Sequence, residues 1–204
     1  MSGLACVHLD QRSFLAVEGP ERREFLQGLV SCDVMKAGPA QALYGAMLTA
    51  QGKFLFDFFL IDAGVSFLLE VAAGRAGEMQ KRLSLYKLRS KVSLRPAPEW
   101  MAAAAFGVGA LAGLGLPGEA GTAQAFAGGF AYADPRLAEA GARLALPVEA
   151  GLAPLEAAGF KPECFEVWDR HRLALALPDG SRDLVPEKAI LLEAGFDELN
   201  GVDW

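Results

Sequence analysis

The chain has 204 residues, of which 52% are hydrophobic and 22% charged, so it can bury a sizeable core and is not a disordered chain. Its formal net charge of −6 argues against direct, sequence-blind binding of nucleic acid, which needs clustered Lys and Arg. The three well-separated cysteines are typical of a reducing compartment, and no apolar run of about 18 residues or basic leader is found. We therefore expect a cytoplasmic protein with no membrane partner.

Residues 1–97 are predicted to form a first α+β unit. Apolar, β-prone segments alternate with stretches such as Phe25, Leu26 and Leu29, where apolar residues recur at helical spacing. The expected elements are strands at Ser13–Val17, Ala42–Thr49, Lys53–Ile61, Val65–Val71 and Lys91–Leu94, with helices at Glu21–Val30 and Arg75–Tyr86. Ala50-Gln51-Gly52 predicts a hairpin turn, and the order of elements predicts an antiparallel sheet with helices on one face.

Residues 98–204 are predicted to form a second α+β unit, since Pro96 and Pro98 interrupt the pattern and strand-like residues then begin again. The expected elements are strands at Trp100–Val108, Ala123–Tyr132 and Ala142–Val148, a loop at Leu111–Gly121, a helix at Lys161–Arg172, and a helix-like stretch followed by a loop at Glu187–Trp204. The fold class is therefore α+β, with two mixed antiparallel-sheet units.

Catalytic motifs are sparse in this sequence. Cys32 has no histidine near it and is interpreted as a small buried residue, not as a nucleophile. His8 and His171 are isolated and lack metal-ligand spacing. Neither a dinucleotide-binding nor a Walker-type glycine pattern occurs. We therefore assign no catalytic residue and no metal site.

Two features carry charge where it is unexpected. Asp57 interrupts a strand that is apolar on both faces, where a carboxylate is costly unless it meets a ligand or a basic partner. The segment Lys81–Lys91 holds five basic residues in an otherwise acidic chain. It is either a solvated helix end, where positive charge is favoured, or a contact for an anionic group. For Asp57, as for Lys81–Lys91, the residues alone leave both a structural role and a ligand-binding role open.

Five passages occur together in the order known from one protein family. They are FLQGLVSCDV (Phe25–Val34), TAQGKFLFDFFL (Thr49–Leu60), LYKLRSKV (Leu85–Val92), DPR with GAR (Asp134–Arg143), and the stretch from Asp183. Together they resemble the YgfZ-type folate-binding proteins of the glycine-cleavage T-protein superfamily. The resemblance implies two mixed antiparallel-sheet units around a folate channel, with tetrahydrofolate as the cofactor. It also implies that the protein helps to maintain iron–sulfur enzymes, including one that modifies tRNA, and that such enzymes are its partners.

The same resemblance suggests folate-binding residues. Asp57 corresponds to the aspartate that contacts the folate amine in the T-protein, Lys87 is the candidate contact for the anionic tail, and Glu193 lies in a Leu-Leu-Glu-Ala-Gly passage similar to one in that enzyme. We also expect the cysteine motif of the family and its C-terminal β-barrel to lie beyond Trp204.

Two other functions stay open at this stage. One is aminomethyltransferase activity on tetrahydrofolate, although Leu191 replaces the arginine of that enzyme's passage. The other is a non-catalytic interaction module whose pocket is filled by Phe54, Phe56, Phe58 and Phe59. Catalysis by this chain is therefore left undecided.

Overall fold

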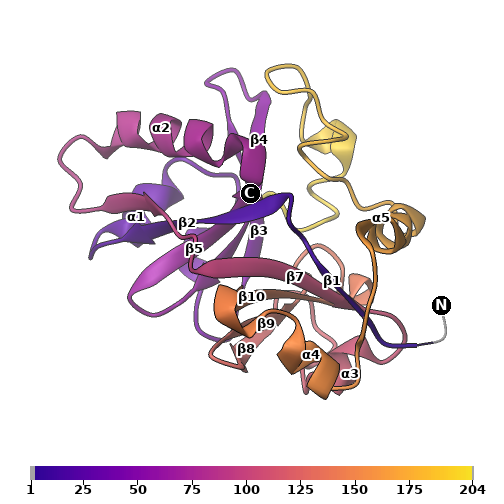
Figure 1. Ribbon diagram of the computed structural model, residues 1–204. Helices are drawn as coiled ribbons and strands as arrows, with labels where there is room; N and C mark the ends of the chain where they lie inside the picture. Colours follow the sequence, from indigo (N-terminus) through magenta and orange to yellow (C-terminus); the bar gives the residue numbers. More distant parts are fainter. Residues whose placement is uncertain (1–2, 204) are drawn as a thin grey trace.

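Residues 3–203, described by a computed structural model, form two packed β-sheets with helices on the outer faces (Figure 1). The five-stranded sheet has the order β3 (Leu43–Leu48), β4 (Phe54–Asp62), β5 (Ser66–Ala72), β2 (Arg12–Glu18) and β6 (Ser93–Pro96). The six-stranded sheet has the order β11 (Lys161–Pro162), β1 (Ala5–His8), β7 (Trp100–Phe106), β10 (Ala142–Pro147), β9 (Gly129–Ala133) and β8 (Ala123–Phe126). The predicted α+β class with mixed, mainly antiparallel sheets is confirmed.

The helices cover the two outer faces. Residues of α1 (Arg22–Gln27) and α2 (Ala76–Lys87) bury Phe25, Leu26, Met79 and Leu83 against the five-stranded sheet. The short helices α3 (Ala110–Gly113) and α4 (Ala153–Ala157) cover the six-stranded sheet, and α5 (Phe165–Ala174) places Trp168 in the layer between the sheets. That middle layer also holds the buried charged side chains of the candidate site. No helix within residues 3–203 is long and apolar enough to cross a membrane.

The hairpin of β3 and β4 forms where the sequence predicts it. Thr49 Oγ1 accepts the backbone N–H groups of Gln51 and Lys53 at 3.2 and 3.1 Å, and Gly52 takes a positive φ of 76°. A hydroxyl that closes a turn and a glycine that supplies positive φ are local features, readable without tertiary context. The turn sets the register that carries Asp57 to its place opposite Ala46.

Four predicted elements differ from the structure, and the first is the predicted loop at Leu111–Gly121, which begins inside the short helix α3. Ala123–Tyr132 is not one strand but the hairpin of β8 and β9, because Ala127 and Gly128 both take positive φ and reverse the chain. The predicted helix at Lys161–Arg172 begins only at Phe165, since Lys161 and Pro162 pair with β1. In the stretch from Glu187, the described residues up to Asp203 form the 3-10 turn Leu192–Ala194 and no α-helix.

The proposed division at residue 97 coincides with a change of sheet. The chain leaves the five-stranded sheet after β6 and enters the six-stranded sheet at β7. β1, from the first part of the chain, nevertheless pairs with β7 of the second part. Two independent units, 1–97 and 98–204, therefore remain a proposal. The expectations for Trp204, and for a cysteine motif and a barrel after it, lie outside the described residues.

Candidate functional site

Six buried charged side chains meet between the two sheets. They are Arg12, Asp57 and Glu70 from the five-stranded sheet, and Asp134, Arg136 and Arg143 from β10 and the loop after β9. We call this set the ionic network. Its three arginines balance its three carboxylates, so the network is neutral as a whole, which makes burial of six charges tolerable.

Glu70 is the centre of the ionic network. Its carboxylate accepts hydrogen bonds from Arg12 Nε at 3.1 Å, from the Tyr132 hydroxyl at 2.9 Å and from Arg143 Nε at 3.2 Å, with a second, shorter contact from Arg143. Burial alone would raise the pKa of Glu70, but the guanidinium groups of Arg143 and Arg12 hold it below its usual range. Glu70 therefore stays ionised at neutral pH.

A second carboxylate, Asp134, holds the two arginines on the six-stranded-sheet side of the network. Arg136 donates to both of its oxygens, at 3.0 and 2.7 Å, and Arg143 lies 3.9 Å from it. Burial would raise the pKa of Asp134, but Arg136 and Arg143 keep it below the ordinary value. Paired N–H donors of this kind fix a carboxylate in position as well as in charge.

Asp57 lies in the same layer, but it is enclosed. Its oxygens lie 3.5 Å from Arg12 Nη1 and 3.3 Å from the Tyr44 hydroxyl, which donates to it. The backbone of Gly180 covers the carboxylate so closely that a Cβ there would lie 2.6 Å from it. The adjoining cavity measures about 20 Å³, enough for about one water molecule. A pterin ring does not fit against Asp57 in this arrangement.

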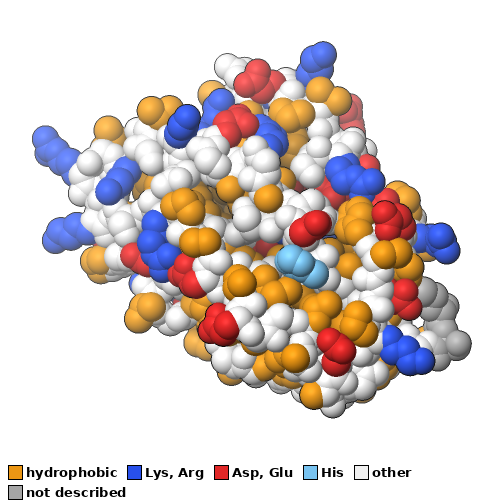
Figure 2. All heavy atoms as spheres, in the orientation of Figure 1, with side chains coloured by type: hydrophobic (Ala, Val, Ile, Leu, Met, Phe, Trp, Pro, Cys, Tyr) orange, Lys and Arg blue, Asp and Glu red, His pale blue; other side chains and the backbone are white. Residues whose placement is uncertain are grey.

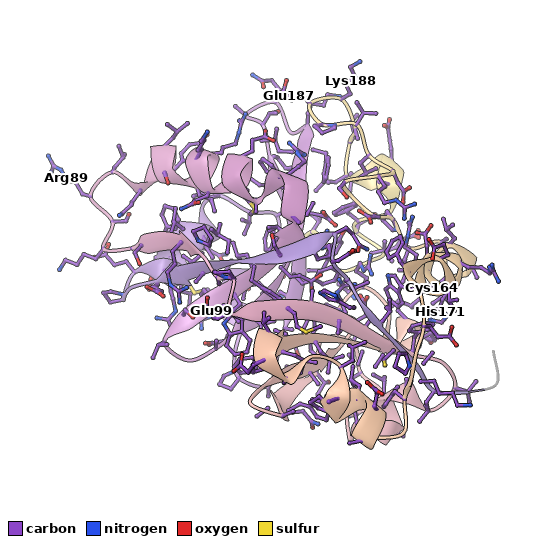
Figure 3. The ribbon with its side chains drawn as sticks, in the orientation of Figure 1. Arg89, Glu99, Cys164, His171, Glu187 and Lys188 are labelled. Atoms are coloured by element: carbon purple, nitrogen blue, oxygen red, sulfur yellow. The ribbon has the colours of Figure 1, made fainter. Side chains whose placement is uncertain are left out.

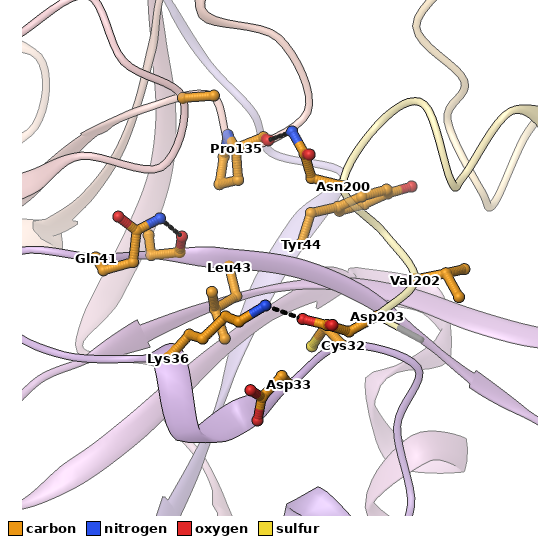
Figure 4. A pocket seen from close by; sticks show the side chains of 12 residues that line it. Cys32, Asp33, Lys36, Gln41, Leu43, Tyr44, Pro135, Asn200, Val202 and Asp203 are labelled. Carbon is orange, nitrogen blue, oxygen red and sulfur yellow. Dashed lines mark hydrogen bonds and ion pairs between the residues drawn. The ribbon is translucent and has the colours of Figure 1, made fainter.

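A larger pocket lies beside the edge strand β3 (Figure 4). It has a volume of about 370 Å³, within the range of small-molecule sites. We call it the β3-edge pocket, and it is lined by Cys32, Asp33, Lys36, Gln41, Ala42, Leu43, Tyr44, Ala120, Pro135, Asn200, Val202 and Asp203. The chain segment after Gly195 thus forms one wall and β3 the other.

The polar groups of the β3-edge pocket are arranged as hydrogen-bond acceptors. Gln41 and Asn200 donate their amide N–H groups to the carbonyl oxygens of Ala42 and Pro135, at 3.1 and 3.0 Å, which leaves their side-chain oxygens for other partners. Asp33 uses one oxygen to cap the following turn, accepting from Met35 N–H at 3.0 Å. Lys36 forms an ion pair with Asp203 (Figure 4).

Tyr44 connects the β3-edge pocket to the ionic network. Its ring lines the pocket and stacks on Phe196, with ring centroids 5.1 Å apart, while its hydroxyl donates to Asp57. Asp57 therefore positions the aromatic wall of the pocket without itself lining it. Cys32, by contrast, is buried, and burial raises the pKa of its thiol to about 12. The thiol is therefore protonated and unreactive at neutral pH.

The structure does not bring the other two predicted residues to Asp57. Lys87 ends α2 on the outer face of the five-stranded sheet, whereas Asp57 faces the layer between the sheets. Glu193 is exposed on the turn Leu192–Ala194. Folate contacts by these residues remain predictions, and one small molecule beside Asp57 would not reach Lys87 without passing round the sheet.

Sequence reasoning missed the partners in the ionic network. Glu70 and Arg143 each interrupt an apolar strand, which is the signal that singled out Asp57. That signal finds Glu70 and Arg143, but not Arg12 at the start of β2 or Asp134 and Arg136 in a loop. Within residues 3–203 no group of three His, Cys, Asp or Glu side chains is placed to hold a metal ion.

Known proteins resemble this chain along most of its length. The human iron-sulfur cluster assembly factor IBA57, mitochondrial, is 34% identical over 218 residues, covering 98% of this chain and 58% of the relative. The IBA57 homologue of Neurospora crassa is 29% identical and covers 96% of this chain. The chain is a YgfZ-like homologue of IBA57. It spans about half the length of these curated relatives, and no protein-family model matches it.

The fold of this YgfZ-like protein resembles that of about half of a T-protein. The glycine cleavage system aminomethyltransferase T from Bartonella henselae superposes with a TM-score of 0.70 over 87% of this chain and 52% of the enzyme. The sequences are 22% identical, so the likeness concerns the fold alone. The expected T-protein-like fold is confirmed.

The expected cytoplasmic location is wrong. The IBA57 relatives from human, mouse and Neurospora crassa are all named mitochondrial. The expectation rested on unpaired cysteines and the lack of an apolar span, and these features do not distinguish one reducing compartment from another.

Proposed function

We propose that this YgfZ-like protein supports the assembly and maintenance of iron–sulfur clusters in client enzymes. The observation that carries the proposal is the similarity to IBA57 along nearly the whole chain. An iron–sulfur enzyme of tRNA modification is one client that the family resemblance suggests. The ionic network ties the two sheets together, and the protonated Cys32 is not an activated nucleophile in the β3-edge pocket.

We further propose that tetrahydrofolate binds in the β3-edge pocket and not directly at Asp57. A carboxylate such as Asp33 pairs well with the N–H groups of a pterin, and the oxygens of Gln41 and Asn200 accept further N–H groups. Tyr44 supplies an apolar wall, and Lys36 would exchange its ion pair with Asp203 for one with the glutamate tail. When bound, tetrahydrofolate would supply a carrier for one-carbon units. Asp57 contributes through the Tyr44 hydroxyl.

Binding of a stable reduced folate to purified variants tests this proposal. Asp33→Asn keeps the turn cap but removes the charge, and should weaken binding by at least about tenfold, the value of one charge-assisted hydrogen bond. Asp57→Asn should weaken binding less, because it acts through Tyr44. The exposed Asp197→Asn is the matched control and should bind normally. Equal affinity of Asp33→Asn and the wild type would refute the pocket assignment.

Two further comparisons complete the test. Polyglutamylated folate should lose its advantage over the monoglutamate in Lys36→Ala if the tail lies at the pocket, and in Lys87→Ala if the tail instead reaches the end of α2. Iron–sulfur enzyme activities in cells that lack the gene should recover with the wild-type gene. A full recovery with an Asp33→Asn gene that no longer binds folate would separate the assembly role from folate.

A further inference from the structure

The end of α2 projects from the five-stranded sheet on the side away from the C-terminal segment (Figure 1). Leu85, Tyr86 and Leu88 have exposed fractions of 76%, 50% and 90% there, which is unusual for three large apolar side chains in one short segment. Exposed basic residues, Lys81, Arg89 and Lys91, accompany them. We call Lys81–Lys91 the α2-end surface. Figure 2 shows Lys and Arg side chains gathered on this side, and Figure 3 shows Arg89 pointing outward.

Leu88 occupies a backbone position that suits glycine. Ser90 N–H donates to the Lys87 carbonyl at 2.7 Å, which closes a tight turn, and Leu88 inside it has φ 39° and ψ −105°. Such a conformation is unfavourable for a residue with a branched side chain. A leucine that is both strained and 90% exposed contributes no burial to the fold. Because the strained Leu88 adds no burial to the fold, its exposed side chain is best explained by a contact with a binding partner.

The α2-end surface is anchored to the fold at its last residue, Lys91, and through the buried face of α2. Lys91 N–H donates to Glu21 Oε2 at 3.0 Å, and Gly19 packs so tightly on the Lys91 carbonyl that a Cβ there would lie 2.1 Å from it. Leu83, on the opposite side of the same helix, is buried in the core. Anchoring a segment on both sides of its exposed residues lowers the entropy cost of binding.

We propose that the α2-end surface docks an acidic segment of a partner protein, with apolar side chains on Leu85 and Leu88 and carboxylates facing Arg89 and Lys91. The basic side chains of this surface are complementary in charge to an acidic segment, whereas the chain as a whole has a net charge of −6. Tyr86 is one aromatic ring between two leucines and not a series of stacking platforms, and the net charge of −6 opposes a phosphate backbone, which disfavours RNA. The net charge of −6 opposes approach to an anionic bilayer, which has the same sign of charge. The proposal stands independently of folate binding.

The test uses a synthetic 15-residue helical peptide with Glu and Leu at i, i+3 and i+4 spacing, titrated into the isotopically labelled chain and followed by NMR. The peptide should shift the amide signals of Leu85–Lys91, and the affinity should fall as salt is raised. A version with Gln for every Glu should bind about tenfold more weakly. Phosphatidylglycerol vesicles and single-stranded RNA are the competing probes.

Two variants separate binding from folding. Leu88→Gly removes the side chain and relieves the strained backbone, so it should weaken peptide binding by about tenfold while the melting temperature stays the same or rises. Arg89→Glu/Lys91→Glu should abolish peptide binding, whereas Lys161→Glu/Lys188→Glu, the same change of charge at exposed sites elsewhere, should not.

Several results would overturn the proposal. They are shifts confined to other residues, equal binding of the Gln peptide, binding of vesicles or RNA but not of the peptide, and a marked loss of stability in Leu88→Gly. The last of these would show that Leu88 serves the fold.

Discussion

Replacing Glu70 by glutamine would leave the three arginines of the ionic network facing two aspartates. Glu70 has no exposed surface, and it accepts hydrogen bonds from Arg12, Arg143 and Tyr132. Removing one partner of a buried ion pair costs about 3–5 kcal/mol, because the remaining charge stays buried without compensation. For a chain of this length, that cost lowers the melting temperature by about 6–20 °C. We therefore expect Glu70→Gln to be folded but much less stable.

Urea unfolding at pH 7, followed by circular dichroism, measures the effect. Glu99→Gln is the matched control, since Glu99 forms an exposed ion pair with Arg95 at 2.8 Å and should change stability by at most about 1 kcal/mol. Glu70→Gln combined with Arg143→Met restores neutrality and should cost clearly less than the sum of the two single changes. A cost of Glu70→Gln below about 1 kcal/mol, or strict additivity in the double variant, would refute the account of the network.

Three other outcomes are expected from the same structure. Folding lowers the pKa values of Glu70 and Asp134, so the stability that these carboxylates contribute is complete above their ordinary pKa and is lost as the pH falls below about 5. Urea unfolding midpoints measured from pH 7 to 3 should fall accordingly, and they should fall less steeply in Glu70→Gln. Gly180→Ala should lower the free energy of unfolding by about 1–3 kcal/mol, because the added Cβ would lie 2.6 Å from Asp57 and 2.8 Å from the Phe54 ring. The control is Gly77→Ala in α2, which has open space and should be neutral or stabilising. A Gly180→Ala protein as stable as the wild type would contradict the enclosure of Asp57. Alkylation at pH 8 followed by mass spectrometry should modify the exposed Cys164 and spare Cys6 and Cys32, whose thiol pKa values burial raises to about 11 and about 12; rapid labelling of Cys32 in the folded protein would show that the β3-edge pocket opens.

The sequence by itself determined the elements that depend on neighbouring residues. The β3–β4 hairpin results from a threonine and a glycine three residues apart, and α2 results from its helical spacing of apolar residues. The same local logic singled out Asp57 as a carboxylate that must have a partner. Local patterns identify such groups because the cost of burying a charge depends on the apolar residues beside it.

Only the tertiary structure decided what those groups meet. Glu70 and Arg143 lie 73 residues apart in sequence and come into contact because the two sheets pack face to face. The stretch from Glu187 was expected to be helix-like, but Phe196 packs on Tyr44 in the middle layer and a single 3-10 turn, Leu192–Ala194, precedes it. Burial of an aromatic ring outweighs the small helix propensity of a short segment. The neighbouring residues do not determine which distant side chain the ring will pack against.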